Sequence, residues 1–180
     1  MLFRSDLIQM TEEEARLLFD KAGSLPNDAV IVELGTYYGG STLVLGSAYN
    51  RGKIFTIDQY EKSYQLYPEN KRTFSLENSI KTFKENNCEH VQPIQGTNSE
   101  IAKDWSLPID LLFIDADHKY ESVKEDIEKW LPKVKLNGLV LFHDYDCYVD
   151  VTKAVYEAIE EKRITIIKKV GTMLLTQRMN

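Results

Sequence analysis

Two short segments of the chain combine carboxylates with imidazoles, side chains that commonly transfer protons or bind cations. Each segment directly follows an apolar run that is typical of a buried strand. The residues are Asp115, Asp117 and His118 after residues 109–114, and His143 and Asp144 after residues 139–142. Neighbouring strands lie about 4.8 Å apart, so in adjacent strands Asp115 would face His143 or Asp144. Acids crowded at one sheet edge repel one another, and a divalent cation or shifted pKa values would relieve that repulsion. The cluster therefore predicts metal binding or proton transfer.

Some of these residues also have a structural interpretation. Asp117 could cap the helix expected to follow it, and His118 could pack on the first turn of that helix. Asp115 and Asp144 directly follow apolar strands, at the sheet edge where α/β proteins bind ligands. A functional interpretation is therefore favoured for these two acids, while both interpretations stay open for Asp117 and His118.

A glycine-containing loop follows the apolar run that begins at Ala29, and it indicates a ligand site. Glycine lets the backbone turn sharply and approach a ligand closely. The spacing is G-x-x-x-G, and Tyr37 stands where a dinucleotide-binding G-x-G-x-x-G has its second glycine, so it would obstruct a pyrophosphate. An NAD-dependent oxidoreductase is therefore disfavoured. Taken alone, the loop could also be a simple tight turn that binds no ligand. The loop residues of interest are Glu33, Gly35, Thr36, Gly39 and Ser41.

Asp58 ends the next apolar run, residues 53–58. An acid at this position can accept hydrogen bonds from both hydroxyls of a ribose, although it could also be a solvated carboxylate at a strand end. The glycine loop and the acid together indicate a cofactor that contains a nucleoside without a bound pyrophosphate.

The elements expected around these residues alternate between strand and helix. Alternation of this kind predicts a mainly parallel sheet with helices on both faces. Strands are expected over residues 29–35, 53–58, 90–96, 109–118 and 139–144, a closing hairpin over 164–176, and helices from Thr11 to Gly23 and over 41–50, 72–87, 120–133 and 150–162.

Finer features of the sequence refine this arrangement. Pro93 indicates an edge strand, and Asn137–Gly138 predict a turn into the strand that follows. In the helix over 72–87, the residues expected to face inward are Phe74, Ile80 and Phe83. The polar segment 59–71 contains Tyr60, Tyr64 and Tyr67, which could form a lid over the site, cover core edges or make a dimer contact.

Composition limits the class of protein. The 180 residues are 43% hydrophobic and 28% charged, which is typical of a globular chain. The net charge of −6 argues against a nucleic-acid backbone as partner. Two cysteines suit a reducing compartment, and no apolar run reaches the roughly 20 residues that cross a bilayer. We expect a cytoplasmic protein with no membrane partner.

Three segments of the chain resemble the class I S-adenosylmethionine-dependent methyltransferases. They are VELGTYYGGST from Val32, TID from Thr56, and the long block from Leu111 to Asp146 that contains FIDADHKYE and FHDYD. The resemblance is to the small O-methyltransferase-like branch (methyltransferase domain 24 type) and covers residues 28–177. It implies a Rossmann-like, doubly wound, mainly parallel seven-stranded sheet with an antiparallel C-terminal hairpin. Residues 1–27 would be an N-terminal helical segment and residues 28–180 the S-adenosylmethionine-binding domain.

The resemblance also implies roles for individual residues. Glu33 and Gly35 would line the methionine side of the cofactor, with Thr36, Gly39 and Ser41 in the same loop, Asp58 at the ribose, and Gly96 and Thr97 beside the adenine. Asp115 would contact the cofactor and face the reacting hydroxyl, and Asp115 and Asp144 match the acids that bind a metal ion in metal-dependent members. The chain departs from the metal-dependent patterns because it reads His143-Asp144-Tyr145, which makes His143 a further candidate ligand. Mg²⁺ prefers oxygen ligands, so the histidine in this set leaves a requirement for Mg²⁺ open.

The expected activity is O-methylation of a small hydroxylated acceptor. Asp115 and Asp144 would hold the acceptor hydroxyl, and His118 or His143 would accept its proton. A non-catalytic module that keeps the fold and binds a cofactor or a protein partner is the alternative. The expected partner is a small molecule and not a nucleic acid, and the sequence leaves a homodimer open.

Overall fold

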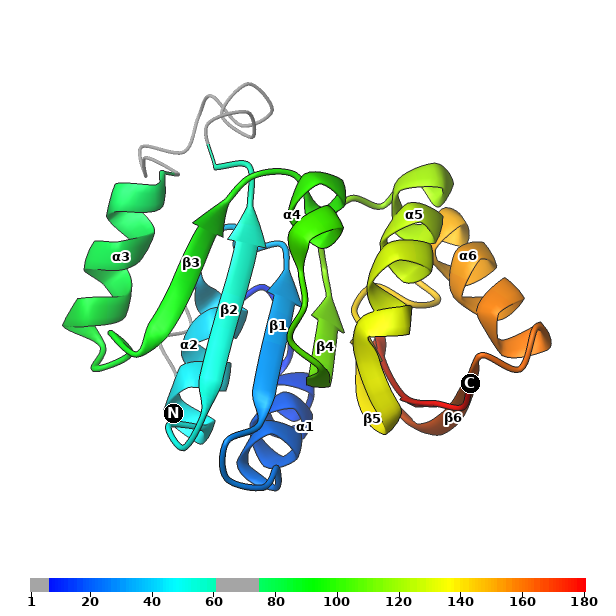
Figure 1. The fold of residues 1–180 in the computed structure, drawn as a ribbon, viewed down its shortest axis with the longest axis horizontal. Coiled ribbons are helices and arrows are strands. Elements are labelled where there is room, and N and C mark those ends of the chain that lie inside the picture. Colours follow the sequence, from blue (N-terminus) through cyan, green and yellow to red (C-terminus); the bar gives the residue numbers. More distant parts are fainter. Residues whose placement is uncertain (1–6, 61–74) are drawn as a thin grey trace.

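A seven-stranded sheet runs through the middle of the molecule (Figure 1). The computed structural model describes residues 7–60 and 75–180. The strands are β1 (Val30–Leu34), β2 (Lys53–Asp58), β3 (Val91–Gln95), β4 (Ile109–Ile114), β5 (Val134–Phe142), β6 (Ile164–Val170) and β7 (Met173–Arg178). The helices are α1 (Glu12–Gly23), α2 (Gly40–Ala48), α3 (Leu76–Glu85), α4 (Asn98–Asp104), α5 (Tyr120–Trp130), α6 (Val149–Glu160) and the short 3₁₀ helix η2 (Leu131–Lys133).

The strand order confirms the predicted doubly wound sheet. Neighbouring strands follow the order β3-β2-β1-β4-β5-β7-β6. Strands β1 to β5 are parallel, and β7 runs antiparallel between β5 and β6. Because β1 pairs with β2 on one side and with β4 on the other, the order reverses between β1 and β4. Open α/β sheets bind ligands outside the carboxyl ends of their strands at such a reversal.

Backbone hydrogen bonds bring the residues that follow these strands side by side. The amide of Gly35 donates to the carbonyl of Ile57, the amide of Asp115 to that of Leu34, and the amide of His143 to that of Ile114. Each bond extends the sheet one residue beyond a strand. The first residues after β1, β4 and β5 therefore emerge at one edge of the sheet.

Alternating apolar side chains bury both faces of the sheet. On β1, Val30, Val32 and Leu34 face one hydrophobic cluster, which α4, α5 and α6 complete. Ile31 faces the opposite cluster, which α1, α2 and Phe83 of α3 complete. No helix within residues 7–60 and 75–180 combines the length and the apolarity that a bilayer crossing requires.

Several finer predictions are confirmed. The side chain of Thr11 accepts from the amide of Glu14 while the Glu14 side chain accepts from the amide of Thr11, so α1 begins with a capping box. Strand β3, which contains Pro93, lies at an edge of the sheet. The C-terminal hairpin turns at Gly171, whose φ is +56°.

Two predictions are wrong. Ile80 is 50% exposed, because only the stripe of α3 that contains Ser79 and Phe83 is buried. Asn137 and Gly138 do not precede their strand, because β5 already begins at Val134 and runs through them. Asn137 has a φ of +64°, and the pairing of β4 with β5 shifts register here, so the two residues form an irregularity inside the strand.

Gly35 joins β1 to the edge of the sheet where the carboxyl ends meet. Its φ is +96°, and a Cβ there would lie 2.0 Å from the carbonyl oxygen of Asp115. Gly35→Ala is therefore expected to lower the free energy of unfolding by about 3 kcal/mol or more, from backbone strain and overpacking together. Urea unfolding measures this loss. In the control Gly23→Ala the new Cβ makes only an ordinary contact at 3.6 Å, so a similar loss there would contradict the explanation.

Candidate active site

A cavity of about 1190 Å³ lies beyond the carboxyl ends of the parallel strands. Ligand pockets commonly measure about 300–1,000 Å³, so this cavity has room for a cofactor and a second small molecule. The residues from the sequence prediction that line it are Gly35, Thr36, Ser41, Asp58, Thr97, Asp115, His118, His143 and Asp144. Glu33, Gly39 and Gly96 are not among the lining residues.

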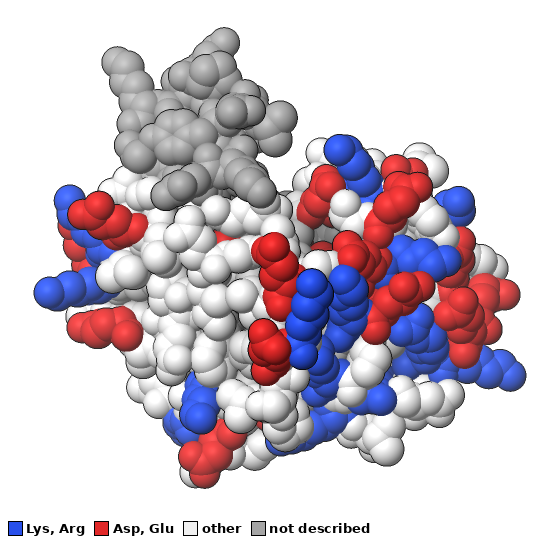
Figure 2. Space-filling model, turned by 45° about the horizontal axis from the view of Figure 1, so that its top comes forward, with Lys and Arg blue, Asp and Glu red and all other residues white. Residues whose placement is uncertain are grey.

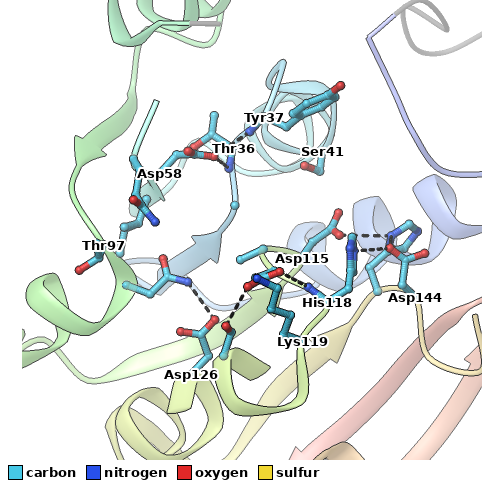
Figure 3. Close-up of a pocket in the computed structure, with 18 of the residues that line it drawn as sticks. Thr36, Tyr37, Ser41, Asp58, Thr97, Asp115, His118, Lys119, Asp126 and Asp144 are labelled. Atoms are coloured by element: carbon cyan, nitrogen blue, oxygen red, sulfur yellow. Dashed lines mark hydrogen bonds and ion pairs between the residues drawn. The ribbon is translucent and has the colours of Figure 1, made fainter. Parts of the chain in front are cut away.

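Asp58 fixes the glycine loop at one end of the cavity. Its Oδ2 accepts hydrogen bonds from the backbone amides of Thr36 at 2.9 Å and Tyr37 at 3.1 Å. Its Oδ1 accepts from the amide of Tyr60 at 2.9 Å. Figure 3 shows Asp58, Thr36 and Tyr37 together at this end. The carboxylate therefore organises the loop, a role that the sequence prediction did not include.

Glu33 lies beneath this loop in a buried polar network. Its side chain is fully buried, and its Oε2 accepts from the hydroxyls of Thr42 at 2.5 Å and Thr56 at 2.6 Å. Thr36 shares a hydrogen bond with Thr56 at 2.6 Å and one with the Tyr60 hydroxyl at 3.2 Å. Tyr60 is also fully buried, so it belongs to the core and not to a lid; Tyr64 and Tyr67 lie outside the described residues.

Burial governs the charge of Glu33. Desolvation raises its pKa to about 7, against the hydrogen bonds from Thr42 and Thr56, which lower it. Its Oε1 is buried and has no hydrogen-bond partner among the described residues. This oxygen lies below the glycine loop, but Glu33 does not line the cavity, so the contact with the methionine side of the cofactor that the resemblance implies stays a prediction.

The raised pKa of Glu33 predicts a pH-dependent stability difference. Between the ordinary pKa of 4.5 and about 7, the folded state holds a proton that the unfolded state releases, so this contribution to stability falls as pH rises. Glu33→Gln lacks the titrating group. Relative to the wild type, its free energy of unfolding should rise by about 2 kcal/mol between pH 5 and pH 8. Urea unfolding of both proteins at pH 5 and pH 8 measures this change. The same difference in free energy between variant and wild type at both pH values would contradict the prediction.

Asp115, His118, His143 and Asp144 form a cluster at the other end of the cavity, as Figure 3 shows for the three of them that it labels. His118 Nε2 lies 2.9 Å from Asp144 Oδ2. His143 Nδ1 lies 3.4 Å from Asp115 Oδ1 and 3.5 Å from Asp144 Oδ2. The ring of His118 also stacks on Tyr148, with ring centroids 4.1 Å apart. The structure therefore brings together the four residues that the sequence predicted for proton transfer.

Mutual contacts shift the pKa values in this cluster. Burial would lower the pKa of His143, but its contacts with Asp115 and Asp144 outweigh burial and raise it to about 10. The contact with Asp144 raises the pKa of His118, and the two histidines lower that of Asp144. At neutral pH His143 is therefore an imidazolium that balances the two carboxylates.

The structure does not show Asp117 as the cap of α5. Its Oδ2 accepts from the hydroxyl of Ser122 at 2.8 Å, and its Oδ1 accepts from the amide of His118 at 2.8 Å. The first amide of α5, that of Tyr120, donates instead to Asp150 Oδ2 of α6 at 3.2 Å. Asp117 therefore braces the loop that presents His118 to the cavity.

The cluster does not fit a resident Mg²⁺ ion. The side chains whose ligand atoms lie within 4.8 Å of one another are Asp115, His118 and Asp144, so His118 replaces the predicted His143 in this set. Mg²⁺ demands near-octahedral coordination, chiefly by oxygen. Here both carboxylates are already paired with imidazoles. The charges of the cluster are therefore balanced by its own side chains.

Asp126 lines the cavity but is not among the residues predicted for the site. Asp126 of α5 is 6% exposed, and its Oδ2 accepts from the side-chain amide of Asn98 at 2.9 Å. Burial raises the pKa of Asp126 to about 7. Trp130 Nε1 donates to the carbonyl of Asn98 at 3.2 Å, so α5 fixes the first residue of α4. The only sequence signal was that Asp126 falls beside the apolar face predicted for this helix.

Comparison with protein families identifies the domain. Residues 32–145 match a family model described as a methyltransferase domain. This segment contains the glycine loop, Asp58 and the complete histidine–aspartate cluster. It begins after α1 and ends before α6.

Curated relatives match part of the chain. A segment of 121 residues is 31% identical to protein y4gI of Sinorhizobium fredii and covers 63% of this chain and 13% of that protein. A segment of 126 residues is 29% identical to protein R132 of Acanthamoeba polyphaga mimivirus and covers 68% of this chain and 54% of that protein. The chain thus spans less than two thirds of the length of either relative.

Solved structures share the fold at low sequence identity. The cofactor-bound Rv0187 from MTB is 18% identical with a TM-score of 0.76, over 99% of this chain and 85% of that one. The O-methyltransferase TomG from Streptomyces achromogenes, in complex with SAM, is 20% identical with a TM-score of 0.71, over 98% and 83%. An rRNA methylase from Streptococcus thermophilus is 16% identical with a TM-score of 0.67, over 95% and 99%. The family model spans most of the chain and these structures share its fold, so the chain belongs to the methyltransferase-domain family.

Proposed function

We propose that the protein transfers the methyl group of S-adenosylmethionine to a hydroxyl oxygen of a small acceptor. The observation that carries the proposal is that one cavity holds both the loop fixed by Asp58 and the cluster of Asp115, His118 and Asp144. The first end suits the nucleoside of the cofactor, and the second offers groups that can bind a hydroxyl and remove its proton.

The residues divide the chemical work between them. When bound, S-adenosylmethionine supplies an activated methyl group on its sulfonium. Asp58 and the glycine loop would hold the ribose and methionine parts, with Thr97 beside the adenine. Asp115 would accept a hydrogen bond from the acceptor hydroxyl and align its oxygen for in-line attack, the main requirement of such a displacement. The new oxygen–carbon bond would form as the sulfur–methyl bond breaks, with S-adenosylhomocysteine as the leaving group, and the hydroxyl proton would pass to a base.

His118 is the base that the geometry favours. Its ring lines the cavity, is 37% exposed, and is held between Asp144 and Tyr148. His143 is buried and already protonated at neutral pH, which makes it unsuitable for accepting a proton. Its positive charge instead allows Asp115 and Asp144 to lie close together. The sequence left the choice between the two histidines open.

The charge distribution supports a small acceptor. The chain carries a net charge of −6. Figure 2 shows acidic and basic side chains interleaved over the region of α5, where a nucleic-acid backbone would favour a continuous basic surface. We therefore infer a small phenol or alcohol as acceptor.

Methyl transfer to a panel of phenols and alcohols tests the proposal. The assay uses S-adenosylmethionine with a labelled methyl group, with EDTA and with added Mg²⁺, and the control is Asp115→Asn. Transfer to at least one acceptor, unaffected by EDTA and lost in the variant, is the expected result. Binding of S-adenosylhomocysteine without transfer to any hydroxyl would favour the non-catalytic module, and transfer to RNA alone would overturn the assignment of a small acceptor.

A further inference from the structure

Glu14 of α1 links three separate segments of the chain. Its Oε2 accepts from the amide of Thr11 at 2.8 Å and from the Thr11 hydroxyl at 2.9 Å, which completes the capping box. Its Oε1 accepts from the amide of Thr172 at 2.6 Å and from the Thr172 hydroxyl at 3.0 Å, in the turn between β6 and β7. The side chain is 3% exposed, so a nearly buried carboxylate joins the N-terminal helix to the C-terminal hairpin.

The third segment that Glu14 reaches is the end of β5. Its Oε2 lies 3.8 Å from His143 Nε2, and that nitrogen is buried without a hydrogen-bond partner among the described residues. The other ring nitrogen, Nδ1, faces Asp115 and Asp144. His143 therefore lies between carboxylates, with Glu14 behind it and the acids of the cavity in front.

The surroundings of Glu14 keep it charged and in place. Burial would raise its pKa, but hydrogen bonds from Thr11 and Thr172 outweigh burial and lower it. Gly171 has a φ of +56°, and a Cβ there would lie 2.4 Å from Glu14 Oε1, so the turn approaches the carboxylate as closely as a glycine permits. An ordinary capping box needs neither the turn contact nor the burial.

We propose that Glu14 is a positioning residue that acts through His143. It would hold the ring with Nε2 toward α1, so that Nδ1 stays directed at Asp115 and Asp144. The role in catalysis rests on the function proposed above. If that function is correct, α1 contributes to catalysis, although this helix lies outside residues 32–145, which match the family model.

The ring of His143 can be observed without any acceptor. The chain has three histidines, His90, His118 and His143, so ¹⁵N-histidine labelling gives three imidazole spin systems. We expect Glu14→Gln to displace the ring signals of His143 and to leave those of His90 unchanged. The matched control is Glu13→Gln, a change of an exposed acid in the same turn of α1, which should move none of them. Unchanged His143 signals in folded Glu14→Gln would overturn the proposal.

Kinetics then separate positioning from a general loss of structure. A displaced His143 ring would no longer hold Asp115, which aligns the acceptor hydroxyl. Misplacement of such a group by 1 Å can cost about 100-fold in rate, so Glu14→Gln should lower kcat by about this factor with little change in KM for S-adenosylmethionine. In a His143→Gln background the same change should have little further effect, because Glu14 acts through His143. Equal losses in both backgrounds would show a merely structural role and overturn the proposal.

A second variant covers the case in which Glu14→Gln fails to fold. Thr172→Val removes one hydroxyl donor to Glu14 and keeps the backbone donor, so it should displace the His143 signals in the same direction by less. Displacement by Thr172→Val would support the proposal, and its absence would contradict it. If the signals respond but no variant or wild-type protein transfers a methyl group, the proposed function fails while the positioning of His143 by Glu14 stands.

Discussion

Asp58→Ala is expected to weaken the binding of S-adenosylhomocysteine by at least about 100-fold. The carboxylate already accepts from three backbone amides, which leaves one lone pair of Oδ1 for a ribose hydroxyl. That hydrogen bond would be lost, and a hydrogen bond to a charged group is worth about 1.5–3 kcal/mol. The variant also removes the acceptor of the amides of Thr36, Tyr37 and Tyr60. The loop that would cradle the cofactor then loses its fixed conformation. Both effects act in the same direction, which makes this the largest binding effect that we predict.

Isothermal titration calorimetry with S-adenosylhomocysteine measures this change. Asp104→Ala is the matched control, because Asp104 is exposed at the end of α4 and does not line the cavity. The control should bind like the wild type, and circular dichroism should show both variants folded. Unchanged affinity in Asp58→Ala would remove the assignment of this end of the cavity to the ribose.

Much of the site could be predicted because it depends on strand ends. A buried apolar run identifies a parallel strand, and the edge where such strands end is where this fold binds ligands. The sequence alone therefore predicts that Asp115 and Asp144 lie close together. The backbone hydrogen bonds that extend the sheet to Gly35, Asp115 and His143 hold these strand ends side by side.

Other features depend on tertiary contacts that no local pattern contains. Glu33 lies inside β1, one residue before its end, and is fully buried against the hydroxyls of Thr42 and Thr56, whereas Asp58 ends β2 and lines the cavity. The partners that bury Glu33 come from α2 and β2, so the pattern of β1 alone does not show them. The capping box of α1 could be seen in the sequence. The approach of Glu14 to His143 could not, because it requires the fold to bring residues 14, 143 and 172 together.

His118→Gln is expected to lower the single-turnover rate of methyl transfer by about 10²- to 10⁴-fold, the usual contribution of a general base. The binding of S-adenosylhomocysteine should change little, because His118 lies beside Asp144 at the acceptor end of the cavity. His90→Gln is the control, since His90 bonds to the carbonyl of Tyr49 and does not line the cavity. A full rate in His118→Gln would exclude this histidine as the base and direct attention to Asp115.

The pH dependence of the rate provides an independent test of the same role. A general base must be neutral, so kcat/KM should rise with pH through the pKa of His118. The contact with Asp144 raises that pKa above its ordinary value of 6.5, which places the midpoint of the rise above 6.5 in the wild type. Asp144→Asn removes the negative charge that favours the imidazolium, so the midpoint should move to lower pH even as the rate falls. A midpoint that does not move would mean that the titrating group is another residue and that Asp144 does not act on His118.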